Sequence, residues 1–189
     1  MTQAYPDHPN LNDNYAPLRM ECEVNDLIIE GEIPQDLYGS FYRNGPDPQF
    51  PPLGQYHWFG GDGMVHAFHF ENGKISYLNR WSKTSKWLQE RKAGKSLIDG
   101  LNPMNSDPQW NPEGSDGTAN TNIIFHAGKL LALEEGHVPF ELDPITLESK
   151  GAYDYGGKLK SPMTAHPKID PVSGDMYGFS YTAENFFSS

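Results

Sequence analysis

The chain has 189 residues, 37% of them hydrophobic and 21% charged, which is enough apolar material for one folded domain. The formal net charge of −11 argues against a nucleic-acid-binding protein, because phosphate recognition needs a basic surface. With 19 glycines and 16 prolines, the composition favours short strands joined by turns and predicts an all-β fold.

The cysteine content and the N-terminal sequence bear on cellular location. Cys22 is the one cysteine, so neither an intramolecular disulfide nor a thiolate metal cluster can form. Residues 1–14 lack the apolar core of a signal peptide, and no apolar run reaches transmembrane length. These features together predict a cytoplasmic protein.

The first third of the chain begins with a polar segment. Residues 1–20 contain Pro6, Pro9 and Pro17 and few apolar side chains, so we expect residues 1–35 to form an N-terminal arm with a first strand within 21–34. The main domain would then occupy residues 36–189. Its first strand, at 37–43, should end at the turn signal of residues 44–46, Asn-Gly-Pro.

The clearest local structure is a hairpin. Residues 64–70 and 74–80 are rich in strand-forming side chains and flank Asn72-Gly73, a strong hairpin signal. Residues 83–97 change to helix-forming types around Trp87 and predict a short helix. Residues 102–120, rich in Pro, Asn, Asp, Ser and Gly, predict a long loop.

Further strands are expected at residues 122–126, 129–134, 139–142 and 175–181. Turn signals recur about every 8 to 12 residues, a spacing typical of a β-sandwich or a β-propeller. A propeller blade takes about 40 to 50 residues, so the chain could hold three or four blades at most. That number is too small to close a propeller ring.

Several histidines are candidate metal ligands. His166 lies between Pro162 and Pro167, which restrict its backbone as a metal ligand requires, although a lone histidine is more often an ordinary core or surface residue. His66 and His69 are three residues apart in an expected strand, so they would point to opposite faces and could not share one metal with His57. His126 and His137 are expected near turns.

Two short motifs invite other interpretations. Residues 60–63, Gly-Gly-Asp-Gly, lack the lysine and spacing of a phosphate-binding loop, so a tight turn at a strand start is the better interpretation. Glu134 and Glu135 could suggest a glycosidase carboxylate pair. Neighbouring strand residues face opposite sides, however, so only one of the two can point inward, where it could orient another group.

Taken together, these stretches resemble the carotenoid cleavage oxygenase family, which includes lignostilbene dioxygenases and the retinal isomerase of the eye. The matching stretches are residues 16–17, 31–34, 41–46, 57–68, 120–122, 126–133, 142–144 and 164–170. They cover nearly the whole chain in the family's order. The resemblance therefore implies that this chain is the N-terminal portion of a seven-bladed β-propeller, of which it holds the first blades and a short helical insertion.

The resemblance also implies chemistry. The family binds Fe(II) through four histidines, three of them oriented by glutamates, and uses O₂ to split a conjugated C=C bond into two carbonyl products. His166 is then expected to be the first iron ligand, and Glu135 a carboxylate that orients a ligand imidazole. Phe59 is expected to line the substrate tunnel. No organic cofactor is implied.

Departures from the family bear on substrate and activity. The lignostilbene branch holds a phenol with a tyrosine and a lysine, where this chain has Leu101 and Glu134, so a 4-hydroxystilbene is a doubtful substrate. The candidate substrates that remain are a carotenoid, an apocarotenoid or another aryl alkene. A peripheral membrane contact for taking up apolar substrates is a further open alternative. With one ligand, the 189 residues alone are expected to be inactive. The alternatives are an inactive propeller fragment that binds another chain and an unrelated propeller module.

Overall fold

The computed structural model describes residues 4–100 and 102–180. Their regular elements are mostly strands, with few helices, as the composition predicts. The strands are β1 (Cys22–Val24), β2 (Gly39–Pro46), β3 (Gly63–Glu71), β4 (Lys74–Trp81), β5 (Asn122–His126), β6 (Lys129–Leu133), β7 (Phe140–Leu142), β8 (Ser149–Ala152), β9 (Lys168–Ile169) and β10 (Met176–Tyr177). The helices are α1 (Ser85–Ala93) and the 3₁₀ turns η1 (Pro9–Leu11), η2 (Asp13–Tyr15), η3 (Trp58–Gly60) and η4 (Pro103–Asn105).

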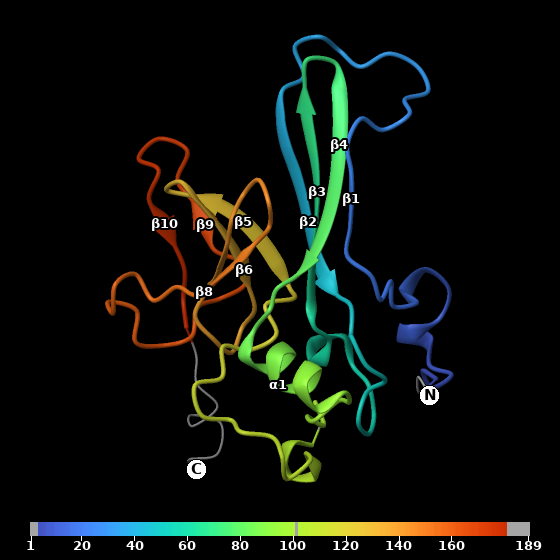
Figure 1. Ribbon diagram of the computed structural model, residues 1–189. Coiled ribbons are helices and arrows are strands. Elements are labelled where there is room, and N and C mark those ends of the chain that lie inside the picture. Colours follow the sequence, from blue (N-terminus) through green and yellow to red (C-terminus); the bar gives the residue numbers. More distant parts are fainter. Residues whose placement is uncertain (1–3, 101, 181–189) are drawn as a thin grey trace.

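The first sheet contains the predicted hairpin. Its strand order is β1-β4-β3-β2, all antiparallel, and β3 pairs with β4 from Met64↔Trp81 to Glu71↔Lys74. Asn72 and Gly73 have φ values of 52° and 71°, which are those of the tight hairpin turn that an Asn-Gly pair favours. The long β2–β3–β4 ribbon stands beside the remaining strands, with α1 at its base (Figure 1).

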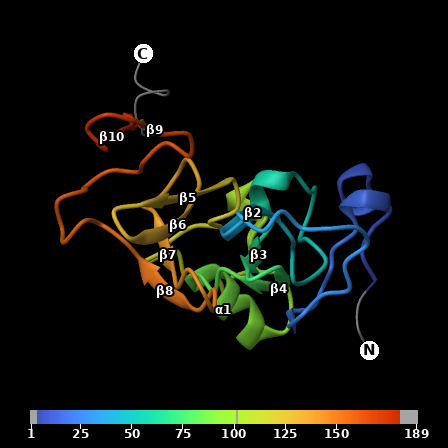
Figure 2. The same cartoon turned by 90° about the horizontal axis from the view of Figure 1, so that it is seen from above.

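The second sheet is a meander in the order β5-β6-β7-β8, and β9 pairs with β10 separately. Seen from above, it lies between the first sheet and the β9–β10 pair (Figure 2). The expected turn between β5 and β6 is present, with Ala127 and Gly128 at φ values of 48° and 78°. Strand β8 was missing from the sequence prediction, and its pairing with β7 is irregular between Glu141 and Leu142.

Three sequence predictions need correction. The strand expected in residues 21–34 is limited to β1. Beyond β1, the Leu27 amide donates to Ile75 O and Asp26 pairs with Lys74, but Ile28 is 98% exposed. Residues 44–46 extend β2 instead of ending it; Pro46 is tolerated there because β2 is an edge strand. Of the strand expected at 175–181, whose last residue lies outside the described residues, the described part forms a strand only in β10, which pairs with two-residue β9.

The helix, the long loop and the turn before β3 agree with the sequence predictions. The helix expected at 83–97 is α1, which begins after Thr84, whose hydroxyl accepts a hydrogen bond from Trp87 N at 3.3 Å. It ends at Gly94, which has a φ of 72°. Residues 102–120 form a loop containing only η4. Residues 60–63 form a turn into β3, as expected.

Strand β6 is buried on both faces and separates two cores. Its even-numbered residues, Leu130 and Ala132, pack against the first sheet. Leu131 and Leu133 face the opposite way and pack against Met163 and Ala165, in the segment that leads to β9. All four strand residues are at most 1% exposed. Glu134 and Glu135 follow directly after the last residue of β6.

Candidate metal and substrate site

His166 lies just before β9, in a segment fixed by backbone hydrogen bonds. The His166 amide donates to Thr164 Oγ1 at 3.1 Å, and the Thr164 amide donates to Phe179 O at 2.9 Å. Thr164 and Ala165 are buried, whereas the His166 side chain is 64% exposed. A fixed backbone with an accessible imidazole suits a metal ligand.

Glu135 is the carboxylate that the structure brings to His166. Its Oε1 atom lies 3.9 Å from His166 Nε2, which is too long for a hydrogen bond. Within residues 4–100 and 102–180, no group of three His, Cys, Asp or Glu side chains could hold a metal. The donor chemistry thus fits part of an iron site, with one imidazole and one carboxylate that could orient a ligand.

Glu134 has a different environment, although it and Glu135 lie beyond the end of β6 at Leu133 and are not strand residues as expected. Its Oε1 atom accepts a hydrogen bond from His137 Nδ1, and this bond raises the pKa of His137 above its usual value. Gly117 lies against the pair, so closely that a Cβ there would be 2.5 Å from His137 Nδ1. Glu134, expected near the substrate, therefore has its carboxylate engaged within the protein.

Phe59 lies in η3 and is 74% exposed. It lines a cavity of about 520 Å³ between the N-terminal arm and the ends of β2 and β3. Tyr15 and Trp58, whose ring centroids are 4.9 Å apart, form an aromatic part of the wall. The polar part includes Arg43, Asn44, His66, Asn120 and Thr121. Such a cavity suits a flat, largely apolar molecule with a polar end. Leu101, the other expected substrate residue, lies outside the described residues.

The remaining histidines have separate partners. His66 Nδ1 lies 2.8 Å from Tyr77 Oη, whereas His69 contacts Ser40 Oγ at 2.7 Å, so the two do not share a site. Burial and then Arg43 lower the pKa of His66. His57 Nδ1 accepts a hydrogen bond from Phe59 N at 3.2 Å, and His126 Nε2 lies 2.9 Å from Gly174 O.

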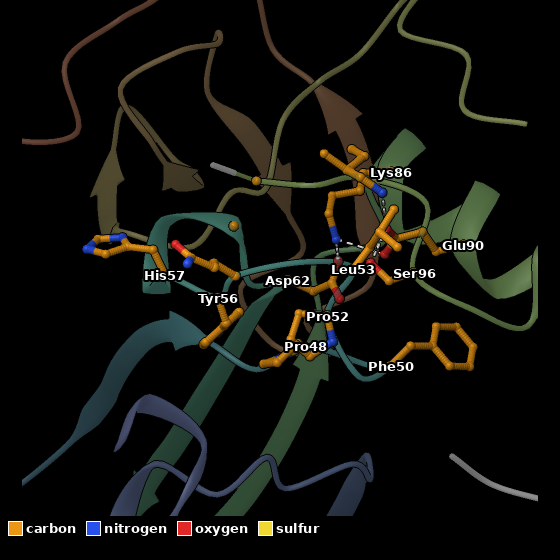
Figure 3. A pocket seen from close by; sticks show the side chains of 14 residues that line it. Pro48, Phe50, Pro52, Leu53, Tyr56, His57, Asp62, Lys86, Glu90 and Ser96 are labelled. Atoms are coloured by element: carbon orange, nitrogen blue, oxygen red, sulfur yellow. Dashed lines mark hydrogen bonds and ion pairs between the residues drawn. The ribbon is translucent and has the colours of Figure 1, made fainter. Parts of the chain in front are cut away.

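A buried ion cluster supports the turn that carries Phe59. Lys86 Nζ lies 2.8 Å from both Asp62 Oδ1 and Glu90 Oε2 (Figure 3). Glu90 Oε1 also accepts hydrogen bonds from the amides of Leu97 and Ile98. A cavity of only about 20 Å³ adjoins the cluster, which is room for about one water. The cluster therefore joins α1 to the turn before β3, and sequence reasoning missed it because Lys86 resembles an ordinary surface lysine of a helix.

Residues 120 and 122 were noted in the sequence only as part of a family motif. Asn120 is 3% exposed, and its Nδ2 atom lies 2.7 Å from Gly61 O and 3.1 Å from both Trp58 O and Phe59 O. Asn122 Nδ2 donates to Ala165 O at 2.7 Å. These partners are 43 to 62 residues away in sequence, so local pattern could not reveal them.

Several named oxygenases are similar to this chain in sequence. The chain is 44% identical to an isoeugenol monooxygenase of Pseudomonas nitroreducens and 44% identical to the lignostilbene-α,β-dioxygenase isozyme III of Sphingomonas paucimobilis. These matches cover 97% and 98% of this chain, which spans 39% and 38% of those proteins. The chain thus spans less than half the length of the curated relatives it matches.

Solved structures show the same fold. A Pseudomonas brassicacearum lignostilbene dioxygenase superposes with a TM-score of 0.89 at 42% identity, covering 95% of this chain and 38% of that one. A variant of the Synechocystis apocarotenoid oxygenase superposes with a TM-score of 0.74 at 34% identity, covering 88% and 38%. The family model described as retinal pigment epithelial membrane protein matches residues 15–188. The chain therefore belongs to this family, that of RPE65 and the carotenoid cleavage oxygenases.

Proposed function

We propose that these residues are part of a longer non-haem iron(II) dioxygenase that uses O₂ to cleave a conjugated C=C bond into two carbonyl products. The two four-stranded sheets and the β9–β10 pair would be the first blades of its seven-bladed propeller. The observation that carries the proposal is the placement of Glu135 Oε1 3.9 Å from His166 Nε2 in a chain of this family. A solved Synechocystis relative with cobalt in place of its metal further supports a metal site.

In the proposed site, His166 supplies one neutral imidazole to the iron, and Glu135 accepts the outer N–H of a ligand imidazole. Bound iron would supply the O₂ chemistry that side chains cannot perform. Phe59, Trp58 and Tyr15 would pack against the flat substrate and exclude water from it. The remaining ligands would come from the rest of the longer protein, so the 189 residues alone would lack activity.

The relatives favour an aryl alkene as the substrate. Those named for isoeugenol, lignostilbene or resveratrol are 42–47% identical to this chain, whereas those named for carotenoids are 38–39% identical. The cavity beside Phe59 combines aromatic and polar walls, which matches an aryl ring with a polar substituent. Membrane contact stays a proposal; among residues 4–100 and 102–180, no helix has the length and apolar character needed to cross a bilayer.

The experiment is O₂ uptake with product analysis on the longer protein, loaded anaerobically with Fe(II). Isoeugenol, a stilbene and an apocarotenoid are offered in turn. We expect one iron per chain, aldehyde products from at least one substrate, and loss of both iron and activity in His166→Ala. Stoichiometric iron in His166→Ala would contradict the assigned ligand. A wild-type protein that binds no iron and cleaves none of the substrates would favour an inactive binding fragment.

A further inference from the structure

Residues 119–122 connect the long loop to β5 and are held by hydrogen bonds to both sheets. Asn44 of β2 donates through Nδ2 to Ala119 O and Asn122 O, each at 2.9 Å. The Thr121 amide donates to Leu133 O at 2.9 Å, at the end of β6. Backbone braced from two directions has little freedom to move, so side chains on it can hold other segments at fixed distances.

The first of these side chains, Asn120, holds the turn that carries Phe59. Its Nδ2 atom faces three carbonyl oxygens, those of Trp58, Phe59 and Gly61, at 2.7 to 3.1 Å. Its Oδ1 atom accepts a hydrogen bond from Thr121 Oγ1 at 2.9 Å, which fixes the orientation of the amide. Because Asn120 is 3% exposed, water cannot easily replace these bonds.

The second side chain, Asn122, holds the segment that carries His166. Its Nδ2 atom donates to Ala165 O at 2.7 Å, and Ala165 is completely buried. The Ala165 carbonyl belongs to the peptide that joins Ala165 to His166. The Asn122 Oδ1 atom accepts a hydrogen bond from Ile123 N at 2.8 Å, so this amide is also fixed in orientation.

We propose that Asn120 and Asn122 are two positioning residues with separate tasks. Asn120 sets the position of the aromatic wall at Phe59, and Asn122 sets the position of the metal ligand His166. Since they are two residues apart on one braced segment, that segment fixes the distance between substrate wall and metal. Asn120 lines the cavity, but its amide is engaged by the turn and by Thr121, and Asn122 is not among the lining residues. The expected effects on iron content and KM rest on the proposed function. The hydrogen bonds by which the two side chains hold their segments do not depend on it.

The first test needs no metal. Amide hydrogen exchange is compared in the 189-residue chain for the wild type, Asn120→Ala and Asn122→Ala. We expect Asn122→Ala to speed exchange at Thr164 and His166 at least tenfold and to leave Gly60 and Gly61 unchanged. Asn120→Ala should speed exchange at Gly60 and Gly61, whose amides bond within the turn that Asn120 holds, and leave Thr164 and His166 unchanged. Equal acceleration at both places would overturn the separation of tasks.

The second test uses the iron-loaded longer protein. Asn122→Ala should lower the iron content at least threefold with KM unchanged, and Asn120→Ala should raise KM at least threefold with iron content unchanged. Asn111→Ala is the matched control, because the exposed Asn111 side chain bonds only to Glu113 N nearby. Variants that change iron content and KM in parallel with their Tm values would show a merely structural role.

Two further points keep the outcomes distinct. Asn120→Ser and Asn122→Ser are milder second variants in case the alanine variants do not fold. We again expect Asn122→Ser to lower the iron content and Asn120→Ser to raise KM. If the wild-type longer protein cleaves no alkene, the proposed function fails. The exchange measurement then still decides whether the two amides hold separate segments.

Discussion

The Lys86 ammonium lies 2.8 Å from the Asp62 carboxylate, and both side chains are nearly inaccessible to water. Burial disfavours the lysine charge, but Asp62 and Glu90 outweigh it, so the pKa of Lys86 lies above its usual value. Asp62 follows the turn that carries Phe59 and also accepts a hydrogen bond from Gln49 N at 3.0 Å. The helix α1 is therefore coupled electrostatically to the turn whose Phe59 lines the larger cavity.

The Lys86→Met variant should be strongly destabilised. It leaves Asp62 and Glu90 buried without their cation, which typically costs about 3–5 kcal/mol of unfolding free energy. The control is Lys74→Met, whose ion pair with Asp26 is well exposed on both sides and should change stability by less than about 1 kcal/mol. Urea denaturation of the two variants measures the difference. Equal losses would show that the Lys86 cluster is not a critical part of the fold.

Asp47 should make stability depend on pH. Burial raises the pKa of Asp47 to about 6 in the folded protein, from 3.8. Protonated Asp47 therefore favours the folded state: its contribution is fully present below pH 3.8 and is lost as pH rises through about 6. The shift corresponds to roughly 2–3 kcal/mol.

Asp47→Asn removes this titration. We compare the unfolding free energies of the wild type and Asp47→Asn at each pH. The wild-type value minus the variant value should fall by roughly 2–3 kcal/mol between pH 4 and pH 7. Urea denaturation at several pH values measures it, and using the difference cancels the effects of the other carboxylates. A difference that does not change with pH would mean that Asp47 has an ordinary pKa in the folded protein.

Glu134→Gln should lower the pKa of His137, because the hydrogen bond from Glu134 is the main cause of its elevation. Imidazole NMR titration of both proteins measures the effect. Since the pKa of His137 is raised on folding, its contribution to stability is present below about pH 6.5, the unfolded value, and is lost as pH rises through the folded pKa. An unchanged titration in Glu134→Gln would rule out the pairing.

Gly63→Ala should disturb the junction between the two sheets. A Cβ at Gly63 would lie 2.7 Å from the carbonyl carbon of Ala119 and 2.8 Å from Thr118 O, both backbone atoms. Overpacking of this kind costs about 1–3 kcal/mol. Gly45→Ala is the matched control, because it lies in the neighbouring strand with no atom within 4 Å of the added Cβ. Thermal unfolding should show a lower Tm only for Gly63→Ala.

The parts of the fold that sequence predicted best are those set by neighbouring residues. The β3–β4 hairpin followed from Asn72-Gly73. Glu134 and Glu135 have different partners, but both lie beyond β6, so the expected strand alternation does not account for them. The structure places His166 near Glu135, while their roles at iron stay a prediction. Phe59 lines a cavity as expected, which does not yet test its contact with substrate.

The missed features depend on residues far apart in the chain. Strand β8 has few strand-forming side chains and exists because β7 offers it a pairing edge. Strand β1 is shorter than its apolar run because its pairing with β4 extends only from Cys22 to Val24. Lys86, Asn120 and Asn122 look like common surface residues until the chain brings their partners to them.

The complete burial of β6 has a consequence for sequence change in this region. Because its residues alternate between two cores, deletion of a single residue within β6 would turn each following side chain to the other face. If the pairing before the deletion is kept, Glu135 would take the place of Glu134, against Gly117, and Gly136 would take the place of Glu135. The five-residue length of β6 thus decides whether any carboxylate lies beside His166.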